Sequence, residues 1–123
     1  MKIVSSNQGI FKKKEDGTEV VYQIFPEFEI HYNTLPSKTE QVWHHHQVIK
    51  EIICITFGEM EVFWKEKGKI ISALVKTGDT VDVEESSHTF KNSSQKDCQF
   101  IVFRFIPSYK DNREIIKNDK IID

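Results

Sequence analysis

Four histidines and one glutamate are the residues of this chain whose types and spacing could bind a metal ion. His44, His45 and His46 are consecutive. Glu51 follows five residues after His46, and His88 lies far along the chain. Side chains alternate between the faces of a β-strand, so a strand here would place His44 and His46 on one face and His45 on the other. Two or three imidazoles with one carboxylate suit first-row divalent metals, and iron, manganese, nickel and zinc all fit.

Simpler interpretations of these residues remain open. The histidines could lie on a surface strand that binds no ion, and His88 could then cap a turn. A register shifted by one residue would pair His45 with Gln47, but an amide is a poorer ligand for these metals than an imidazole. Glu51 directly precedes the apolar run 52–55, where an ionised carboxylate needs a partner. This position favours the metal hypothesis over both alternatives.

The segments that would position these residues are nearly all β-strands. Short runs rich in β-branched and aromatic residues are separated by turn signals, as in an antiparallel sandwich or barrel. The predicted strands are 28–33, 51–57, 61–64, 70–75, 80–83 and 99–106, and a hairpin joins 12–15 to 18–25. The turn signals are Asp16-Gly17, Gly58, Gly68 and Gly78. The only helical candidate is a short tail segment that Asp111 or Asn112 would cap and that would end at Ile116.

Two segments of this β-rich pattern resemble the sequence motifs of the cupin superfamily. The first cupin motif reads H-x-H, three or four residues, E, six residues, G, and residues 44–58 match its longer form. The second reads G-D…H-x-x-x-N, and it is matched by Gly78-Asp79 with His88 and Asn92. The resemblance covers about residues 28–106.

The resemblance implies both a fold and a set of ligands. Cupins are all-β jelly rolls, also described as a double-stranded β-helix, so we expect one such barrel domain over residues 1–123 with a short C-terminal tail or helix. Carried over position by position, the family's metal ligands are His44, His46, Glu51 and His88. The implied cofactor is one divalent transition metal ion: iron, manganese, nickel or zinc.

Two turns depart from the family pattern. The glycine that opens the first motif is Lys38 here, and the Pro-x-Gly turn of the second motif is replaced by Glu84-Glu85-Ser86-Ser87. These positions shape turns and carry no metal ligand. The departures therefore affect the expected loop geometry more than the expected metal site, and the two glutamates could form an acidic rim at the barrel mouth.

Three further residues are candidates for the wall of a pocket. Arg104 lies on an apolar strand face, where an arginine usually meets an anion or a carboxylate, such as Glu51 or a residue of a partner subunit. Phe90 has the same strand alternation phase as His88. His31 lies on the polar face of its strand, so we expect it at the surface, with an acid or base role in the pocket as the alternative.

The strand predicted at 99–106 indicates a homodimer. One face carries Phe100, Val102, Arg104 and Ile106, and the other carries Ile101, Phe103 and Phe105. A strand that is apolar on both faces is covered on both. The barrel interior covers one face, and a second layer, the tail or a partner subunit must cover the other.

Composition and charge limit which binding partners and which cellular compartment we expect. The chain has 123 residues and a formal net charge of −2, which favours neither nucleic acid nor an anionic membrane. No apolar run reaches transmembrane length and no signal-peptide core is present, so we expect a cytoplasmic protein. Cys54 and Cys98 lie in apolar runs and are predicted to be small core residues rather than a disulfide.

These features predict a small-molecule site with three possible functions. The first is a metal-dependent enzyme, an oxygenase or an isomerase, acting on a small polar metabolite. The second is a non-enzymatic cupin that binds a sugar-like or anionic ligand. The third is a metal-free sugar-nucleotide isomerase or epimerase, which needs a histidine base and usually a tyrosine acid but no complete ligand set. No nucleophilic triad, phosphate-binding glycine loop or dinucleotide fingerprint occurs.

Overall fold

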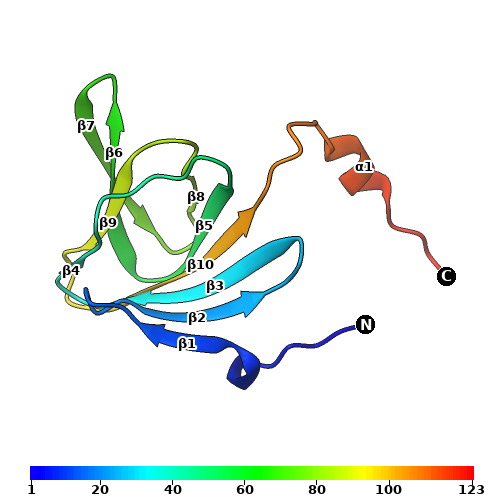
Figure 1. Ribbon diagram of the computed structural model, residues 1–123, viewed down its shortest axis with the longest axis horizontal. Helices are drawn as coiled ribbons and strands as arrows, with labels where there is room; N and C mark the ends of the chain where they lie inside the picture. Colours follow the sequence, from blue (N-terminus) through cyan, green and yellow to red (C-terminus); the bar gives the residue numbers. More distant parts are fainter.

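Two antiparallel sheets form the body of the molecule. The computed structural model describes residues 1–123. The six-stranded sheet has the order β1 (Ile10–Lys13), β2 (Glu19–Ile24), β3 (Phe28–Leu35), β10 (Cys98–Phe105), β5 (Lys50–Phe57) and β8 (Thr80–Asp82). The four-stranded sheet has the order β4 (Thr39–Glu40), β9 (His88–Asn92), β6 (Glu59–Glu66) and β7 (Lys69–Lys76). The two sheets curl toward each other and leave the barrel interior between them (Figure 1).

The all-β jelly roll that the sequence predicts is confirmed. Every predicted strand is present within two residues of its expected ends, and α1 (Arg113–Asn118) follows Asn112 as expected, although it ends two residues later. Besides the short 3₁₀ turn η1 (Ser6–Gln8), the sequence analysis missed β4 and β9. Strand β4 has only two residues, and four of the five side chains of β9 are buried, so neither shows the alternation that marks a half-buried strand.

The core between the sheets comes from strands whose side chains alternate inward and outward. In β5, Glu51, Ile53 and Ile55 are buried while the residues between them are partly exposed. The buried apolar residues are Leu35, Ile53, Ile55, Met60, Val62, Val83, Phe90, Cys98, Phe100 and Val102. Glu51 therefore lies at the end of a core-facing row, which directs a carboxylate into the barrel.

The two turns that depart from the family pattern keep a glycine-like backbone. Lys38 has φ 60° and Glu84 has φ 54°, both in the left-handed region that favours glycine. Gly58, Gly68 and Gly78 also have positive φ, as expected at turns. The chain thus uses non-glycine residues in left-handed turns on both sides of the histidine segment, at a cost of about 1 kcal/mol each.

Strand β3 reverses the expected relation between polarity and exposure. His31 and Asn33 are buried, at 6% and 7% exposure, while Tyr32 between them is 45% exposed. The expectation that His31 lies at the surface is therefore wrong. The reason is that the polar face of β3 lines a polar cavity inside the barrel, and its apolar face points outward.

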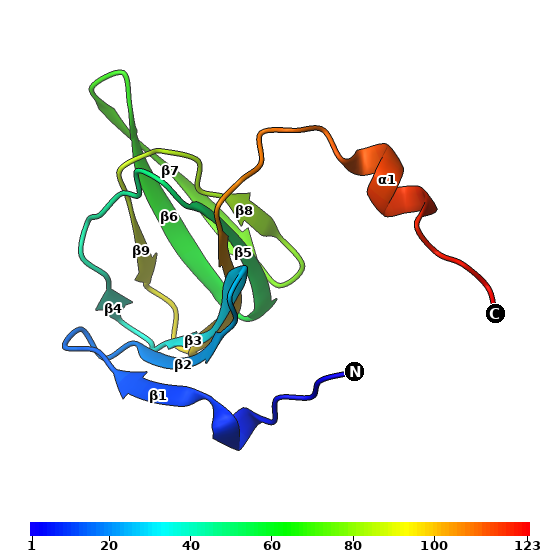
Figure 2. The same ribbon diagram turned by 45° about the vertical axis from the view of Figure 1, so that its right-hand side comes forward.

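The outward face of the six-stranded sheet is apolar over several strands. Ile101 pairs with Tyr32 and Phe103 pairs with Ile30, and paired residues of an antiparallel sheet point to the same side. The apolar residues on this outer face are Phe11, Val21, Phe28, Ile30, Tyr32, Ile52, Cys54, Ile101, Phe103 and Phe105. Helix α1 lies apart from both sheets in two views and leaves this face uncovered (Figures 1 and 2).

No helix has the length and apolarity that a membrane crossing requires.

Candidate metal centre

The four predicted ligands come from three parts of the barrel that converge at one end. Glu51 lies in β5 and His88 opens β9. His44 and His46 lie in the segment between β4 and β5, which crosses from one sheet to the other. The expected strand at these histidines is reduced to one bridge, in which the backbone N–H groups of His44 and His88 each donate to the other's carbonyl oxygen at 3.0 and 2.9 Å. This bridge still directs His44 toward His88.

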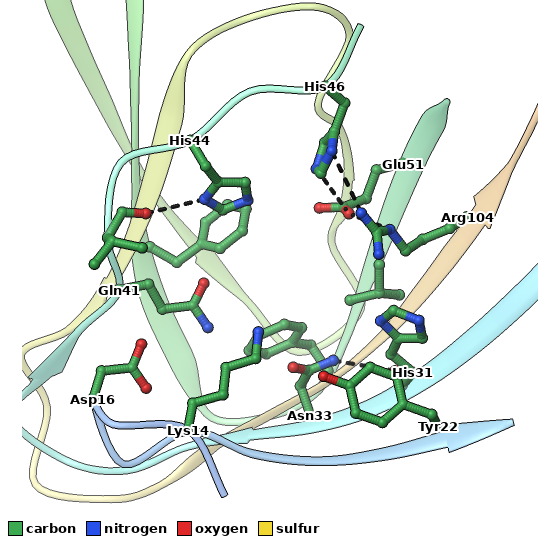
Figure 3. Close-up of a pocket in the computed structure, with 14 residues that line it drawn as sticks. Lys14, Asp16, Tyr22, His31, Asn33, Gln41, His44, His46, Glu51 and Arg104 are labelled. Carbon is green, nitrogen blue, oxygen red and sulfur yellow. Dashed lines mark hydrogen bonds and ion pairs between the residues drawn. The ribbon is translucent and has the colours of Figure 1, made fainter. Parts of the chain in front are cut away.

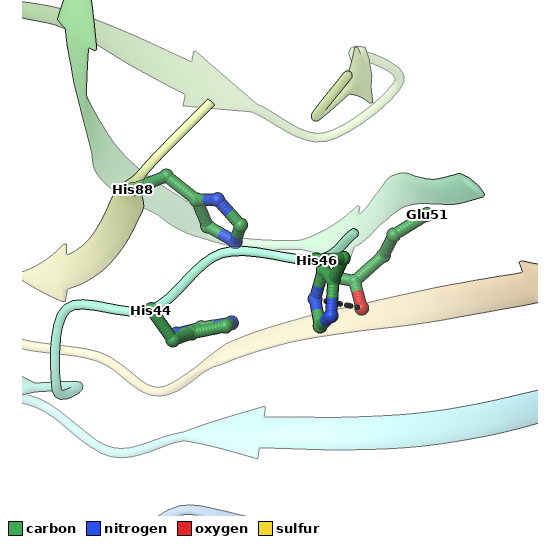
Figure 4. A group of neighbouring side chains, drawn as sticks. All are labelled: His44, His46, Glu51 and His88. Carbon is green, nitrogen blue, oxygen red and sulfur yellow. Dashed lines mark ion pairs between the residues drawn. The ribbon is translucent and has the colours of Figure 1, made fainter. Parts of the chain in front are cut away.

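The ligand atoms of His44, His46, Glu51 and His88 all lie within 4.8 Å of one another (Figure 4). His46 Nε2 is 3.2 Å from Glu51 Oε2. Two ligands that are each about 2.1 Å from one ion are at most about 4.2 Å apart. Ligands at right angles are about 3 Å apart, so the side chains need to move by about an ångström to share an ion.

The hydrogen bonds of two imidazoles suit metal ligation. His44 Nδ1 lies 3.0 Å from the Val42 carbonyl oxygen, and His88 Nδ1 lies 2.8 Å from that of Ser86. A carbonyl only accepts, so each Nδ1 carries the proton and each Nε2 presents a lone pair. The Nε2 atom of His88 is buried without a hydrogen-bond partner, and the buried Nε2 atom of His46 has only the carboxylate of Glu51 beside it, at 3.2 Å. Metal-ligating histidines show this pattern, because the second nitrogen donates to a fixed acceptor.

Burial keeps two of these imidazoles neutral. Desolvation is the largest cause that lowers the pKa of His88 and of His46 below the ordinary value of 6.5. The neighbouring charges of His44 and, for His46, of Arg104 lower the pKa further, and the carboxylate of Glu51 opposes them. Both side chains are therefore unprotonated at pH 7, which a metal ligand requires.

Arg104 compensates the charge of the buried Glu51. The two residues are cross-strand neighbours in β10 and β5, and Arg104 Nε lies 3.1 Å from Glu51 Oε2. A second nitrogen, Arg104 Nη2, lies 3.4 Å from His46 Nδ1. The guanidinium thus contacts two of the four predicted ligands from inside the barrel (Figure 3).

A cavity of about 260 Å³ adjoins the cluster. All three residues that the sequence analysis proposed for a pocket wall, His31, Phe90 and Arg104, line it. The other lining residues are Lys14, Asp16, Tyr22, Asn33, Gln41, Val42, His44, His46, Glu51, Phe100 and Val102. The sequence analysis missed the hairpin residues Lys14 and Asp16, because charges next to a Gly turn are typical of a solvated loop. Only the position of the hairpin against the barrel places them here.

His31, which lines this cavity, pairs with the partly exposed carboxylate of Glu29, which does not. His31 Nε2 lies 2.7 Å from Glu29 Oε2, and the ring of Tyr22 packs edge-on with its centroid 4.5 Å away. Desolvation lowers the pKa of His31, and the bond to Glu29 partly offsets that effect. Burial therefore keeps the imidazole neutral in the cavity despite the pairing with Glu29, and it can accept or donate a proton there.

Comparison with known proteins supports the fold. No protein-family model and no curated protein matches the sequence. Among solved structures, Drosophila melanogaster CENP-C bound to CAL1 is 18% identical with a TM-score of 0.72, over 83% of this chain and 84% of that chain. A predicted oxalate decarboxylase from Thermotoga maritima is 18% identical with a TM-score of 0.68, over 86% and 100%. Hydroxypropylphosphonic acid epoxidase from S. wedmorenis in complex with fosfomycin is 17% identical with a TM-score of 0.71, over 85% and 59%.

These similarities define the fold of the chain. A Drosophila melanogaster structure described as the CENP-C cupin domain is also matched, at 18% identity and a TM-score of 0.70 over 83% of this chain and 74% of that chain. At such identities the likeness concerns the fold, and the chain has the fold of the cupin superfamily. Within that fold it carries a cluster of three histidines and one glutamate that could hold a metal ion.

Proposed function

We propose that this cupin binds one divalent transition metal ion through His44, His46, Glu51 and His88 and acts with it on a small polar metabolite. The observation that carries the proposal is the buried Nε2 atom of His88, which has no partner, close to the Nε2 of His46 and the carboxylate of Glu51, which lie 3.2 Å apart. Buried polar atoms without partners are uncommon in folded proteins, and a bound ion would satisfy both nitrogens.

The residues around the cluster have different roles in the proposed metal site. When bound, the ion would supply Lewis acidity, and with iron or manganese also redox chemistry, to a metabolite with oxygen donors. The backbone carbonyl oxygens of Val42 and Ser86 orient two imidazoles. Apolar side chains of Phe90, Phe100 and Val102 limit water on one wall of the cavity.

The buried imidazole of His31, paired with the partly exposed Glu29, favours an enzyme over a passive binding protein. A neutral imidazole with a carboxylate partner is a proton-transfer group, whereas ligand capture requires none. An isomerase or an oxygenase that removes a substrate proton would use it. The same pair with Tyr22 keeps a metal-free isomerase or epimerase as the second candidate, because that chemistry needs a histidine and a tyrosine in the pocket.

Metal content separates these candidates. The purified protein is reconstituted in turn with iron, manganese, nickel and zinc, dialysed, and analysed by elemental mass spectrometry alongside His88→Ala and the control His45→Ala. We expect near one equivalent of metal in the wild type and in His45→Ala, and a loss of at least tenfold in His88→Ala. No retained metal in the wild type would overturn the metal proposal and favour the metal-free candidate.

We also propose that the protein is a homodimer formed through the outer face of the six-stranded sheet. Tyr32 and Phe11 are 45% and 62% exposed on this apolar face, and contiguous patches of this kind mark interaction sites. Sedimentation should give the mass of two chains, and Phe103→Glu should give the mass of one. A wild-type mass equal to one chain would exclude the dimer.

The cysteines support a cytoplasmic location. Cys54 and Cys98 are both free, and free thiols persist in reducing compartments. Cell fractionation of the native protein tests this location, and recovery outside the cytoplasm would contradict it.

A further inference from the structure

We infer that the metabolite bound in this cavity is a small dianion that lies between the metal cluster and the ammonium group of Lys14. The inference rests on the proposed metal site and adds the class of ligand. It is carried by the charges of the cavity wall, by the position of Lys14 and by the size of the cavity.

The charges of the wall leave a positive excess once a metal is bound. Lys14 and Arg104 are the cations of the cavity, and Asp16 and Glu51 are its carboxylates, so these side chains balance. A divalent ion therefore adds two positive charges that no side chain of the wall offsets. A dianion restores neutrality at the bound ion.

The two cations of the cavity are not equivalent. Arg104 is already engaged, with its Nε 3.1 Å from Glu51 Oε2. Lys14 forms no ion pair with any carboxylate of the chain. Asp16, its neighbour on the hairpin, accepts a hydrogen bond from the backbone N–H of Thr18 at 2.8 Å. Lys14 is thus the cation that is available to a ligand, and Arg104 is the one that holds the metal cluster together.

The hairpin between β1 and β2 places the backbone of Lys14 beside the cavity. The backbone N–H of Lys14 donates to the Thr18 carbonyl oxygen at 2.8 Å, and its own carbonyl oxygen accepts from Gly17 at 3.0 Å. Figure 3 shows the side chain extending from this hairpin toward the centre of the cavity, between Gln41 and Asn33. The preceding lysines, Lys12 and Lys13, do not line the cavity. Of the three consecutive lysines, only Lys14 is therefore in position to contact a ligand in the cavity.

The size and lining of the cavity restrict the dianion. A volume of about 260 Å³ corresponds to about nine water molecules, so the ligand has on the order of ten non-hydrogen atoms or fewer. The amides of Asn33 and Gln41 and the hydroxyl of Tyr22 supply hydrogen-bond donors on the wall beside Lys14. A small dicarboxylate, or a carboxylate joined to a phosphonate, matches these donors at one end and the metal cluster at the other. A neutral sugar would leave Lys14 unpaired.

Calorimetric titration of the zinc-loaded protein tests the inference. The probes are oxalate, malonate, succinate and phosphonoacetate, with malonamide as the neutral comparator of malonate. We expect at least one dianion to bind in the cavity and malonamide to bind at least tenfold more weakly than malonate. In Lys14→Gln the affinity of the best dianion should fall about tenfold, while Lys13→Gln, a matched change on the same hairpin, should leave it unchanged.

Metal content is measured again after each titration, because dianions also chelate free zinc. Equal affinities in Lys14→Gln and Lys13→Gln, or no binding of any of the four dianions to protein that retains its zinc, would overturn the inference and leave the metal proposal intact. A wild type that never retains metal fails the earlier test instead. The two failures are therefore distinguishable.

Discussion

The two faces of the six-stranded sheet show opposite chemistry. Beside part of the apolar core, the inner face carries His31, Asn33, Glu51 and Arg104 around a polar cavity, whereas the outer face carries mostly aromatic and aliphatic side chains that are partly exposed. In an ordinary half-solvated sheet the polar face is the outer one. The reversal indicates that this sheet is built to hold a polar site inside and to meet another apolar surface outside.

Metal removal should produce the largest change in the free energy of unfolding. Only substitutions on the inner face should alter this change. At a free metal concentration about a thousandfold above the dissociation constant, binding to the folded state alone adds about 4 kcal/mol to the free energy of unfolding. Urea unfolding of the metal-loaded protein with and without a chelator measures this difference. His46→Ala should abolish it and Tyr32→Ser, on the outer face, should keep it. The same chelator effect in His46→Ala would contradict the assignment of this ligand.

Replacing Arg104 should have the second-largest effect on stability. Arg104→Leu leaves the buried carboxylate of Glu51 without its compensating charge, and breaking a buried pair from one side costs about 3–5 kcal/mol. Because the Arg104 side chain is 29% exposed, we expect a smaller loss of about 2–3 kcal/mol in the metal-free protein.

Urea unfolding at pH 7 also provides the control for this variant. Lys91→Leu breaks the exposed pair with Glu40, whose atoms are 3.9 Å apart, and should cost at most about 1 kcal/mol. If Arg104→Leu and Lys91→Leu lower the free energy of unfolding equally, the inner pair contributes no more to stability than an exposed pair.

Much of the fold was accessible from the sequence because it depends on local signals. Strand alternation and glycine turns predict the strands, and the motif spacing predicts which four residues meet at the end of the barrel. The inner and outer faces of β3 could not be assigned in the same way. The alternation of Ile30, His31 and Tyr32 shows that two faces differ, but only the closure of the sheet decides that the polar one is inside. The role of Lys14 depends likewise on where a hairpin packs.

Substitutions on the outer face should weaken dimer association rather than folding. Tyr32→Ser removes an exposed ring, so the free energy of unfolding per chain should change by less than about 0.5 kcal/mol at concentrations where the protein is monomeric. In the proposed dimer the same change removes a central aromatic contact and should raise the dissociation constant about tenfold. Sedimentation over a range of concentrations measures this constant. An unchanged constant would move the interface away from this face.

The smallest effect should be a pH dependence that originates at His31. Its pKa in the folded protein is lowered from 6.5, mainly by burial, while the unfolded chain keeps the ordinary value. The unfolded state therefore binds a proton more readily, and stability falls as the pH drops below about 6.5 and on through the lower folded pKa. Glu29, Tyr22, Arg104 and Glu51 surround the imidazole, and the charges of the two glutamates oppose that of Arg104.

Replacing His31 with glutamine should flatten this dependence. Between pH 7.5 and 5.5, the metal-free wild type should lose more stability than His31→Gln, by up to about 1 kcal/mol. His46 and His88 have pKa values lowered in the same direction, so part of the slope should remain in the variant. Urea unfolding at several pH values measures both slopes. If His31→Gln and wild type lose the same stability on acidification, His31 is open to solvent, and the inner face of β3 is less closed than its burial indicates.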